Sequence, residues 1–185
     1  MKPRILLYLS LGLALLAPAC GGKGGAETAG QTIRAATGYN VIPYAGDKRR
    51  TPKGWSGFDL AGGTLRSASF NGSVTVVNIW ASWCAPCRVE QADLEKVATA
   101  YAPRSVRFLG VNIRDTNAAA RAHVDEFEVT YPSVSDPDSL IASKYRVRVV
   151  PTTFVLDRSG RIAYQILGPT NEADLVRILD KELAA

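Results

Sequence analysis

The sequence is short of the residues that build metal and haem sites. Its 185 residues include only three cysteines, one histidine and one methionine. Structural zinc sites need four cysteine or histidine ligands, and beyond the pair Cys84 and Cys87 only Cys20 and His123 remain. Covalent haem attachment needs a histidine directly after the second cysteine, and Arg88 stands there. We therefore expect neither a metal nor a cofactor.

The sequence also lacks strong charge of either sign and a long hydrophobic run. Its formal net charge is +5, which becomes +3 without Lys2 and Arg4. A charge this small and scattered does not indicate a nucleic-acid partner. The apolar stretch from Ile5 to Ala17 is shorter than the about 20 residues of a bilayer-spanning helix. A hydrophobic content of 46% with 21% charged residues is typical of one globular domain with an appendage.

The first twenty residues have the pattern of an export signal. Lys2 and Arg4 form a basic end, an apolar stretch follows, and the small residues of "PAC" close it. This pattern resembles bacterial lipoprotein signals, in which the closing cysteine, here Cys20, is lipidated and becomes the new N-terminus. Ala17 stands where leucine is usual, so an ordinary secretory signal that leaves Cys20 as a free thiol remains the alternative.

The export signal defines the expected domain organisation. We expect a signal peptide over residues 1–19, a flexible glycine-rich tether over 20–38 and one folded domain over 39–185. The domain would then lie on the outer face of the cell membrane, anchored as a lipoprotein. Thiols tend to oxidise in that compartment.

Hydrophobic periodicity divides the chain after residue 56 into strands and helices, whereas residues 31–52 give no firm prediction. In order, we expect a hairpin over 57–70 that turns at Gly62 and Gly63, a buried strand over 73–80, a helix over 87–101, a buried strand over 106–113, helices over 117–127 and 139–145, a hairpin over 152–168 that turns at Gly160, and a helix over 171–183 capped by Asn171 or Thr170. This order predicts an α/β fold in which a mixed central β-sheet is flanked by helices on both faces.

The two nearby cysteines fall where a buried strand ends and a helix begins. Unpaired N–H groups of the first helical turn and the helix dipole favour negative charge there, which predicts that Cys84 is a thiolate of low pKa. Cys87 lies one turn further along the same face and should be more buried. Cys84 would form a mixed disulfide with a substrate, and Cys87 would resolve it. Pro86 suits an early helical position.

Four motifs together resemble the TlpA/ResA-like thiol-disulfide oxidoreductases of the thioredoxin superfamily. They are "VVNIWASWCAPCRVE", "FLGVNIRD", "VVPTTFVLDRSGRI" and the apolar signal that ends in cysteine. The resemblance covers Gly57 to the C-terminus and implies a thioredoxin-like fold. It also implies that Pro151 is a cis-proline facing the cysteine pair, with Val150 offering backbone hydrogen bonds to an extended substrate; a trans-proline at a strand edge is the alternative. Trp83 and Pro86 complete the expected substrate-binding surface.

The chain departs from thioredoxin itself at several positions. Asn78 replaces a buried aspartate that relays protons, and an amide cannot exchange a proton near neutral pH. Ala92 replaces a helix-kinking proline, so a straighter helix is expected. Glu90 is a candidate proton relay or partner contact, but we favour a solvated helix charge. We expect His123 on the surface and Trp80 in the core.

The resemblance implies a membrane-tethered enzyme that keeps exported cysteines reduced. Its expected partners are exported cysteine-containing proteins, among them apocytochrome c, a transmembrane electron donor, and the membrane through the lipid anchor; we expect a monomer. Two alternatives stay open. The same chemistry can run as an oxidant that introduces disulfides into secreted proteins, because the direction depends on how well the fold stabilises the thiolate. The chain can also be a non-catalytic binding module with a structural disulfide.

Overall fold

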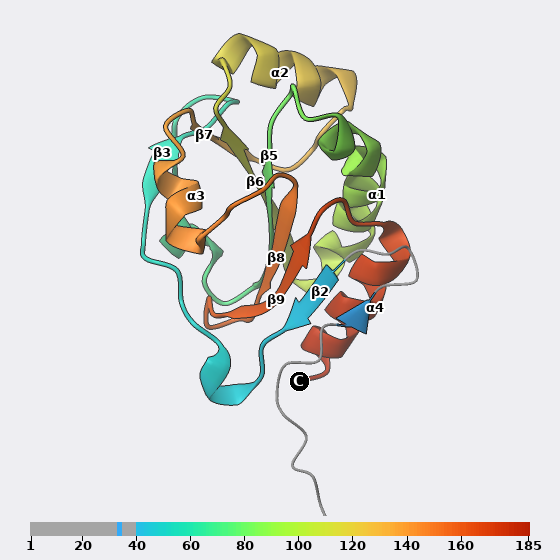
Figure 1. Ribbon diagram of the computed structural model, residues 1–185. Coiled ribbons are helices and arrows are strands. Elements are labelled where there is room, and N and C mark those ends of the chain that lie inside the picture. The colour runs from blue at the N-terminus through green and yellow to red at the C-terminus, as the bar shows by residue number, and fades with distance from the viewer. Residues whose placement is uncertain (1–32, 35–39) are drawn as a thin grey trace, which may run out of the picture.

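The computed structural model describes residues 33–34 and 40–185 (Figure 1). The predicted signal peptide, Cys20 and nearly all of the tether lie outside the described residues. In the described part, no helix is both long enough and apolar enough to cross a membrane.

A seven-stranded mixed sheet forms the centre of the domain, in the order β1-β2-β9-β8-β5-β6-β7. β5, β6 and β7 run parallel to one another, whereas β8, β9 and β2 join with antiparallel pairing. Its strands are β1 (Ile33–Arg34), β2 (Asn40–Pro43), β5 (Val74–Trp80), β6 (Val106–Ile113), β7 (Ser133–Asp136), β8 (Thr152–Leu156) and β9 (Ile162–Leu167). A separate hairpin consists of β3 (Ser56–Phe58) and β4 (Thr64–Arg66).

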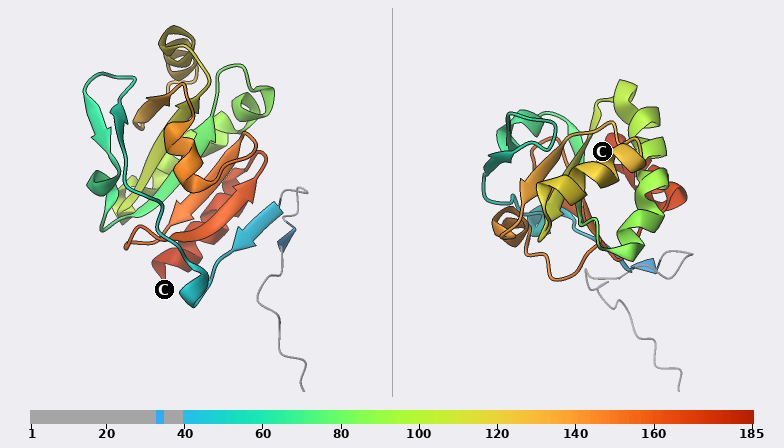
Figure 2. Two further views of the ribbon diagram at one scale, coloured as in Figure 1. Left: turned by 60° about the vertical axis from the view of Figure 1, so that its left-hand side comes forward. Right: turned by 90° about the horizontal axis from the view of Figure 1, so that it is seen from above.

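Helices cover both faces of this sheet, as predicted (Figure 2). α1 (Ala85–Tyr101) and α4 (Glu172–Leu183) pack together on one face, and α3 (Leu140–Tyr145) lies on the other face with the β3–β4 hairpin. α2 (Asn117–Glu126) lies beyond the end of β5 (Figure 1). Short 3-10 helices span Gly46–Lys48, Ser67–Phe70 and Ala102–Arg104.

β5 is buried along its whole length because it lies in the middle of a doubly covered sheet. Val76 packs with Leu94 of α1 in the core on one face. Val77 packs with Leu109 and Phe154 in the core on the other face. Burial on both faces explains why this strand reads as a continuous apolar run rather than as an alternating pattern.

The N-terminal part of the domain, whose structure could not be predicted from the sequence, is held by β2 and by an ion-pair cluster. β2 pairs with β9 along an edge of the main sheet. The guanidinium of Arg49 then donates to both carboxylate oxygens of Glu182 in α4, at 2.7 and 2.8 Å, and to Asp157 at 3.0 Å. The side chains of Glu182 and Asp157 are only 4% and 9% exposed. This cluster links the start of the domain to its last helix.

α1 agrees with the prediction in length but not in its buried face. It runs without interruption for 17 residues, to the predicted end at Tyr101. Val89, which the sequence pattern placed on the buried stripe, is 75% exposed. Its neighbour Glu90 is buried instead, with 1% exposure. The buried stripe of α1 is therefore displaced by one residue near its start.

Candidate active site

The junction of β5 and α1 positions both cysteines. Cys84 is the N-cap of α1, and its sulfur accepts a hydrogen bond from the backbone N–H of Cys87 at 3.2 Å. Pro86 occupies the first turn, where a missing N–H leaves no helical hydrogen bond unmade. The predicted placement of these three residues is confirmed.

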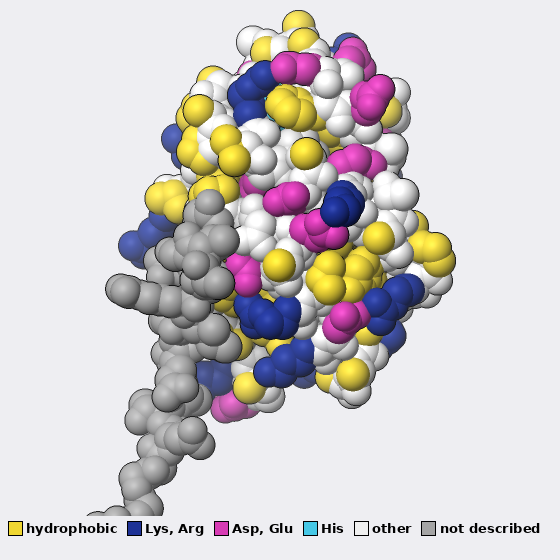
Figure 3. Space-filling model, turned by 90° about the vertical axis from the view of Figure 1, so that its right-hand side faces the viewer, with side chains coloured by type: hydrophobic (Ala, Val, Ile, Leu, Met, Phe, Trp, Pro, Cys, Tyr) yellow, Lys and Arg dark blue, Asp and Glu magenta, His cyan; other side chains and the backbone are white. Residues whose placement is uncertain are grey.

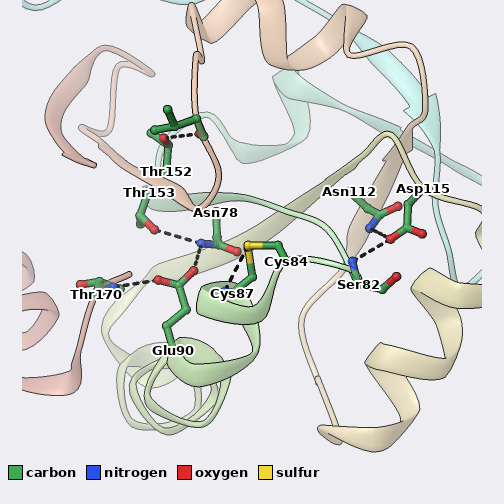
Figure 4. Close-up of a disulfide and its surroundings, with 11 residues drawn as sticks. Asn78, Ser82, Cys84, Cys87, Glu90, Asn112, Asp115, Thr152, Thr153 and Thr170 are labelled. Carbon is green, nitrogen blue, oxygen red and sulfur yellow. Dashed lines mark hydrogen bonds between the residues drawn. A yellow bond between two sulfur atoms is a disulfide. The ribbon is translucent and has the colours of Figure 1, made fainter. Parts of the chain in front are cut away.

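Cys84 and Cys87 form a disulfide in this structure (Figure 4). Cys84 is 4% exposed and Cys87 is 1% exposed, so Cys87 is the more buried sulfur, as expected. Apolar side chains that include Leu60 and Trp80 pack around the pair. Trp83, next to Cys84, is 57% exposed. The exposed surface next to Cys84 therefore includes this indole.

The loop before Cys84 is tied to the loop that follows β6. The carboxylate of Asp115 accepts hydrogen bonds from the backbone N–H of Ser82 at 2.7 Å and from the amide of Asn112 at 3.0 Å. The indole N–H of Trp83 donates to the carbonyl oxygen of Arg114 at 2.9 Å. Burial alone would raise the pKa of Asp115, but these hydrogen bonds outweigh it and hold the pKa below its ordinary value. The anchor is therefore a charged carboxylate.

A cis-proline lies beside the disulfide. The peptide bond between Val150 and Pro151 is cis, which confirms the prediction. Val150 packs against the apolar cluster that contains both cysteines, and Thr152 pairs with Ile79 at the end of β5 nearest to them. Within the described residues, the backbone groups of Val150 have no hydrogen-bond partner. They remain available to an added strand.

Glu90 is buried beside the disulfide, so the prediction of a solvated helix charge is wrong. One carboxylate oxygen accepts from the Asn78 side chain at 2.8 Å, and the other accepts from the backbone N–H of Thr170 at 2.7 Å. Asn78 also donates to the hydroxyl of Thr153 at 3.0 Å. Figure 4 shows this cluster on one side of the disulfide, with Ser82 and Asp115 on the other. The backbone N–H of Thr170, in the β9–α4 loop, supplies the hydrogen bond that stabilises the inward orientation of the Glu90 side chain.

Burial raises the pKa of Glu90 to about 8, and the hydrogen bonds from Thr170 and Asn78 offset this only in part. The carboxyl group is therefore mostly protonated at neutral pH. An ordinary cysteine thiol has a pKa of about 8.5. Because Glu90 lies three residues after Cys87, the two side chains share a helix face.

His123 is also buried, so the expectation of a surface residue is wrong. Its side chain is 2% exposed and lies between the rings of Trp80 and Phe127, with centroid distances of 4.5 and 4.6 Å. Neither ring nitrogen has a hydrogen-bond partner among the described residues. Burial, followed by the nearby charge of Arg88, lowers the pKa of the imidazole. In the described part of the chain, His, Cys, Asp and Glu side chains form no group that could hold a metal ion.

Comparison with known proteins matches the fold and site to one family. The family model of the AhpC/TSA family matches residues 49–165. The chain belongs to the AhpC/TSA family. It is 29% identical to the thiol-disulfide oxidoreductase ResA of Geobacillus kaustophilus over 122 residues, which cover 66% of this chain and 70% of that protein. It is 36% identical to the thiol:disulfide interchange protein HelX of Rhodobacter capsulatus over 115 residues, 62% of this chain and 63% of HelX.

Solved structures agree with this AhpC/TSA assignment. A DsbF homologue from Corynebacterium diphtheriae superposes with a TM-score of 0.71 at 30% identity, covering 81% of this chain and 98% of that one. A secreted thiol-disulfide isomerase from Corynebacterium glutamicum gives a TM-score of 0.74 at 26% identity, with 84% and 99% covered. The protein is thus a thioredoxin-like thiol-disulfide oxidoreductase of the ResA and HelX type.

In this AhpC/TSA-family chain, the structure brings together most of the residues that the sequence singled out. Around the disulfide lie Trp83, Pro86, Val150, Pro151, Asn78 and Glu90. Asp115, Thr153 and Thr170 also contribute to this site, although none of them was predicted as a site residue. Asp115 had a usable signal, because it follows the end of a strand parallel to the one before Cys84, and such ends meet at one edge of a sheet.

Proposed function

We propose that this protein is a membrane-tethered reductase of exported protein disulfides, with Cys84 and Cys87 as its catalytic pair. The observation that carries the proposal is the position of Cys84 at the N-cap of α1, with the more buried Cys87 behind it. A carboxyl group that titrates near neutral pH, Glu90, lies one turn further along the helix. The proposed nucleophile is thus the N-cap of α1, and the resolving thiol and the proposed proton acceptor follow in its first two turns.

The proposed reaction begins from the reduced protein. The Cys84 thiolate attacks one sulfur of a substrate disulfide, a mixed disulfide forms, and the other substrate sulfur leaves as a thiolate that takes a proton from water. Cys87 then gives its proton to ionised Glu90 and attacks the Cys84 sulfur. The second substrate sulfur leaves as a thiolate. The substrate gains two electrons, and the protein is left with the Cys84–Cys87 disulfide.

The substrate lies in the proposed complex against Trp83, Pro86 and the cis-proline. An extended segment pairs with the unbonded backbone groups of Val150, as a strand adds to a sheet edge. Pro151 has no backbone N–H that could donate to the substrate. The substrate segment therefore pairs with Val150 and does not continue its pairing along β8. The side chain of Trp83 covers the apolar part of the bound segment.

The proposed setting is the outer face of the membrane. Lipid on Cys20 and the tether would hold the domain close to the bilayer, where a transmembrane electron donor can reduce the disulfide again. Exported cysteine-containing proteins, including apocytochrome c before haem attachment, are the proposed substrates. The resemblance to ResA-like proteins and the proline at position 86, where reducing thioredoxins also have proline, support the direction of reduction.

Equilibration with glutathione tests the proposal. We expect a reduction potential well below the glutathione couple and rapid alkylation of Cys84 after mild reduction. About 30 mV corresponds to roughly 1.4 kcal/mol for this two-electron couple, so a modest difference is measurable. A potential well above the couple, with disulfide formation in a reduced test protein, would reverse the direction to oxidation. A pair that resists alkylation in the folded protein would instead be structural, and Cys84→Ser and Cys87→Ser are the controls that assign the reacting sulfur.

A further inference from the structure

A second surface feature lies next to α3 and has no role in the proposed exchange reaction. It is a hollow of about 550 Å³, lined by Arg50, Thr51, Lys53, Ser143, Lys144 and Arg146. We call these six residues the basic hollow, because four of them are cationic and none is acidic. The hydroxyl group of Thr51 adds a donor that suits an oxyanion, whereas the hydroxyl of Ser143 already donates to the carbonyl oxygen of Leu140 at 2.8 Å.

The cations of the basic hollow are not neutralised by acidic side chains. In the part of the chain that the structure describes, Arg50, Lys53, Lys144 and Arg146 form no ion pair. The face formed by α1 and α4 differs, because charges of both signs are interspersed there (Figure 3) and pair as Lys96–Glu172 and Arg104–Asp180. The positive potential of the basic hollow is therefore uncompensated.

Backbone contacts hold two of these like charges near each other. The guanidinium of Arg50 donates to the carbonyl oxygen of Tyr145 at 2.7 Å and to that of Lys144 at 3.4 Å. Arg146 ends α3 in the left-handed conformation, and its N–H bonds to the Ser143 carbonyl at 3.0 Å. Burial and the charge of Arg146 both lower the pKa of Arg50. An anion bound between the two would relieve this repulsion.

Arg146, which lines the basic hollow, lies four residues before Val150, which packs against the cysteine cluster. Between them lies the exposed Arg148, which forms no ion pair with another described residue. Acidic groups near the disulfide are already engaged, because Asp115 anchors a loop and Glu126 pairs with Arg88. A partner bound at Cys84 that extends past Val150 would therefore approach the cationic side chains of Arg148 and Arg146.

We infer that the basic hollow binds an acidic segment of the protein whose disulfide is exchanged at Cys84. The inference rests on the proposed function, because it names the class of substrate that the disulfide site receives. Complementary charge raises the encounter rate and selects among partners that carry the same cysteines. The preferred substrates are exported proteins with several glutamates or aspartates in the segment beside the cysteine pair.

Two synthetic peptides with one internal disulfide test the inference. They are identical except that one carries a run of glutamates and the other a run of lysines. Each peptide is made in two versions, one with the run before the disulfide and one with the run after it. The reduced protein is mixed with each oxidised peptide, and the initial rate of peptide reduction is measured. We expect the glutamate peptide to react about tenfold faster at low ionic strength. The difference should shrink at high salt.

Matched charge reversals locate the effect. Arg146→Glu should remove most of the preference for the glutamate peptide. Lys181→Glu changes the charge equally on α4, which packs on the opposite face of the sheet from α3, and should leave the preference intact. An unchanged preference in Arg146→Glu would overturn the assignment of the acidic segment to the basic hollow.

The outcomes separate this inference from the proposed function. If neither peptide is reduced, the proposed reductase activity fails. If both are reduced at equal rates, the activity stands and the inference is wrong. Equal rates together with binding of the protein to phosphatidylglycerol vesicles, abolished by Arg146→Glu, would assign the basic hollow to a lipid surface instead.

Discussion

Glu90 has a carboxyl group in the protein interior, with each oxygen accepting one hydrogen bond. Its pKa of about 8 makes it a proton acceptor for Cys87 only in the minority ionised form at neutral pH. The rate of the resolving step should therefore rise with pH as this group ionises. In the proposed mechanism, position 90 would thus give the exchange reaction a pH dependence of its own.

Replacing Glu90 by glutamine should slow resolution, and it also removes one of the two hydrogen bonds that the carboxyl group accepts, because only the amide oxygen can accept. Glutamine has nearly the shape of the protonated acid but cannot accept the proton, and positioned proton acceptors contribute roughly 100-fold or more to rates. Stopped-flow measurement of mixed-disulfide decay across the neutral range should show a large drop and no inflection near pH 8. Glu95→Gln, a change on the outer part of α1, is the control. A variant that retains the wild-type pH profile would remove Glu90 from the proton path.

His123 should make the protein sensitive to mild acid. Its pKa is lowered in the folded state, so the unfolded chain binds the proton more tightly. The stabilising effect of the neutral ring is present above the unfolded pKa of about 6.5 and is lost as the pH falls below it. Urea unfolding at neutral and at mildly acidic pH should show this loss, and His123→Phe should reduce it. An equal loss in both proteins would place the acid-sensitive group elsewhere.

The burial of Glu90 and of His123 could not be predicted from the sequence. Burial of Glu90 depends on a backbone N–H from the β9–α4 loop, 80 residues away, which no local pattern contains. His123 lies in a helix rich in charge and alanine, and only packing against Trp80 reveals its buried face. By contrast, Cys84 and Cys87 were predictable because a strand-to-helix junction is a local feature.

At the scale of elements, the N-terminus of α1 should set the chemistry of Cys84. The N-cap position and the N–H of Cys87 stabilise the thiolate, whereas Cys87 lies inside the helix and receives no such bond from the first turn. Thiolate absorbance of the reduced protein should reveal one cysteine that ionises well below about 8.5, and Cys84→Ser should abolish this transition. Two groups that both ionise near 8.5 would contradict it.

The central elements were predictable from sequence, and the edge elements were not. β5, α1 and β6 have long apolar or amphipathic patterns, and the turn of the last hairpin has Gly160 at positive φ as expected. β7 is four residues of mixed polarity that become a strand only by pairing with β6. β2 likewise depends on the edge offered by β9. Short edge strands follow from tertiary pairing rather than from local propensity.

At the scale of the whole molecule, Arg49 joins the start of the domain to its end. Removing one partner of a buried ion pair leaves an uncompensated charge and typically destabilises a protein by about 3 to 5 kcal/mol. Arg49→Met should lower the free energy of unfolding by about this much, because Glu182 and Asp157 then lose their common partner. Chemical denaturation measures the change.

A second substitution checks the cause. If the loss comes from the unpaired carboxylate, Glu182→Leu in the Arg49→Met background should restore part of the stability. Arg177→Met removes an exposed partner of Asp174 and should have a small effect. A loss in Arg49→Met no larger than this control would mean that the cluster does not stabilise the domain.

The proposed anchor also belongs to the whole molecule. Cys20 should be the first residue of the mature protein and should carry acyl groups, which mass spectrometry of the membrane fraction detects. Cys20→Ser should release the protein from that fraction. A soluble, unmodified mature chain that begins at another residue would contradict the lipoprotein hypothesis. A tether of about 20 residues reaches on the order of 25 Å if it is flexible, so a lipidated domain would work close to the bilayer.

The hydrogen bond from Trp83 to Arg114 has a practical consequence for observing this chemistry. The indole of Trp83 is largely exposed, but its hydrogen bond to the neighbouring loop orients the ring. Trp83 directly precedes Cys84 in the chain. A disulfide quenches the emission of a nearby tryptophan, and reduction removes the quencher. The chain therefore contains its own optical reporter, and the two redox states can be distinguished by fluorescence in unlabelled protein while the reaction proceeds.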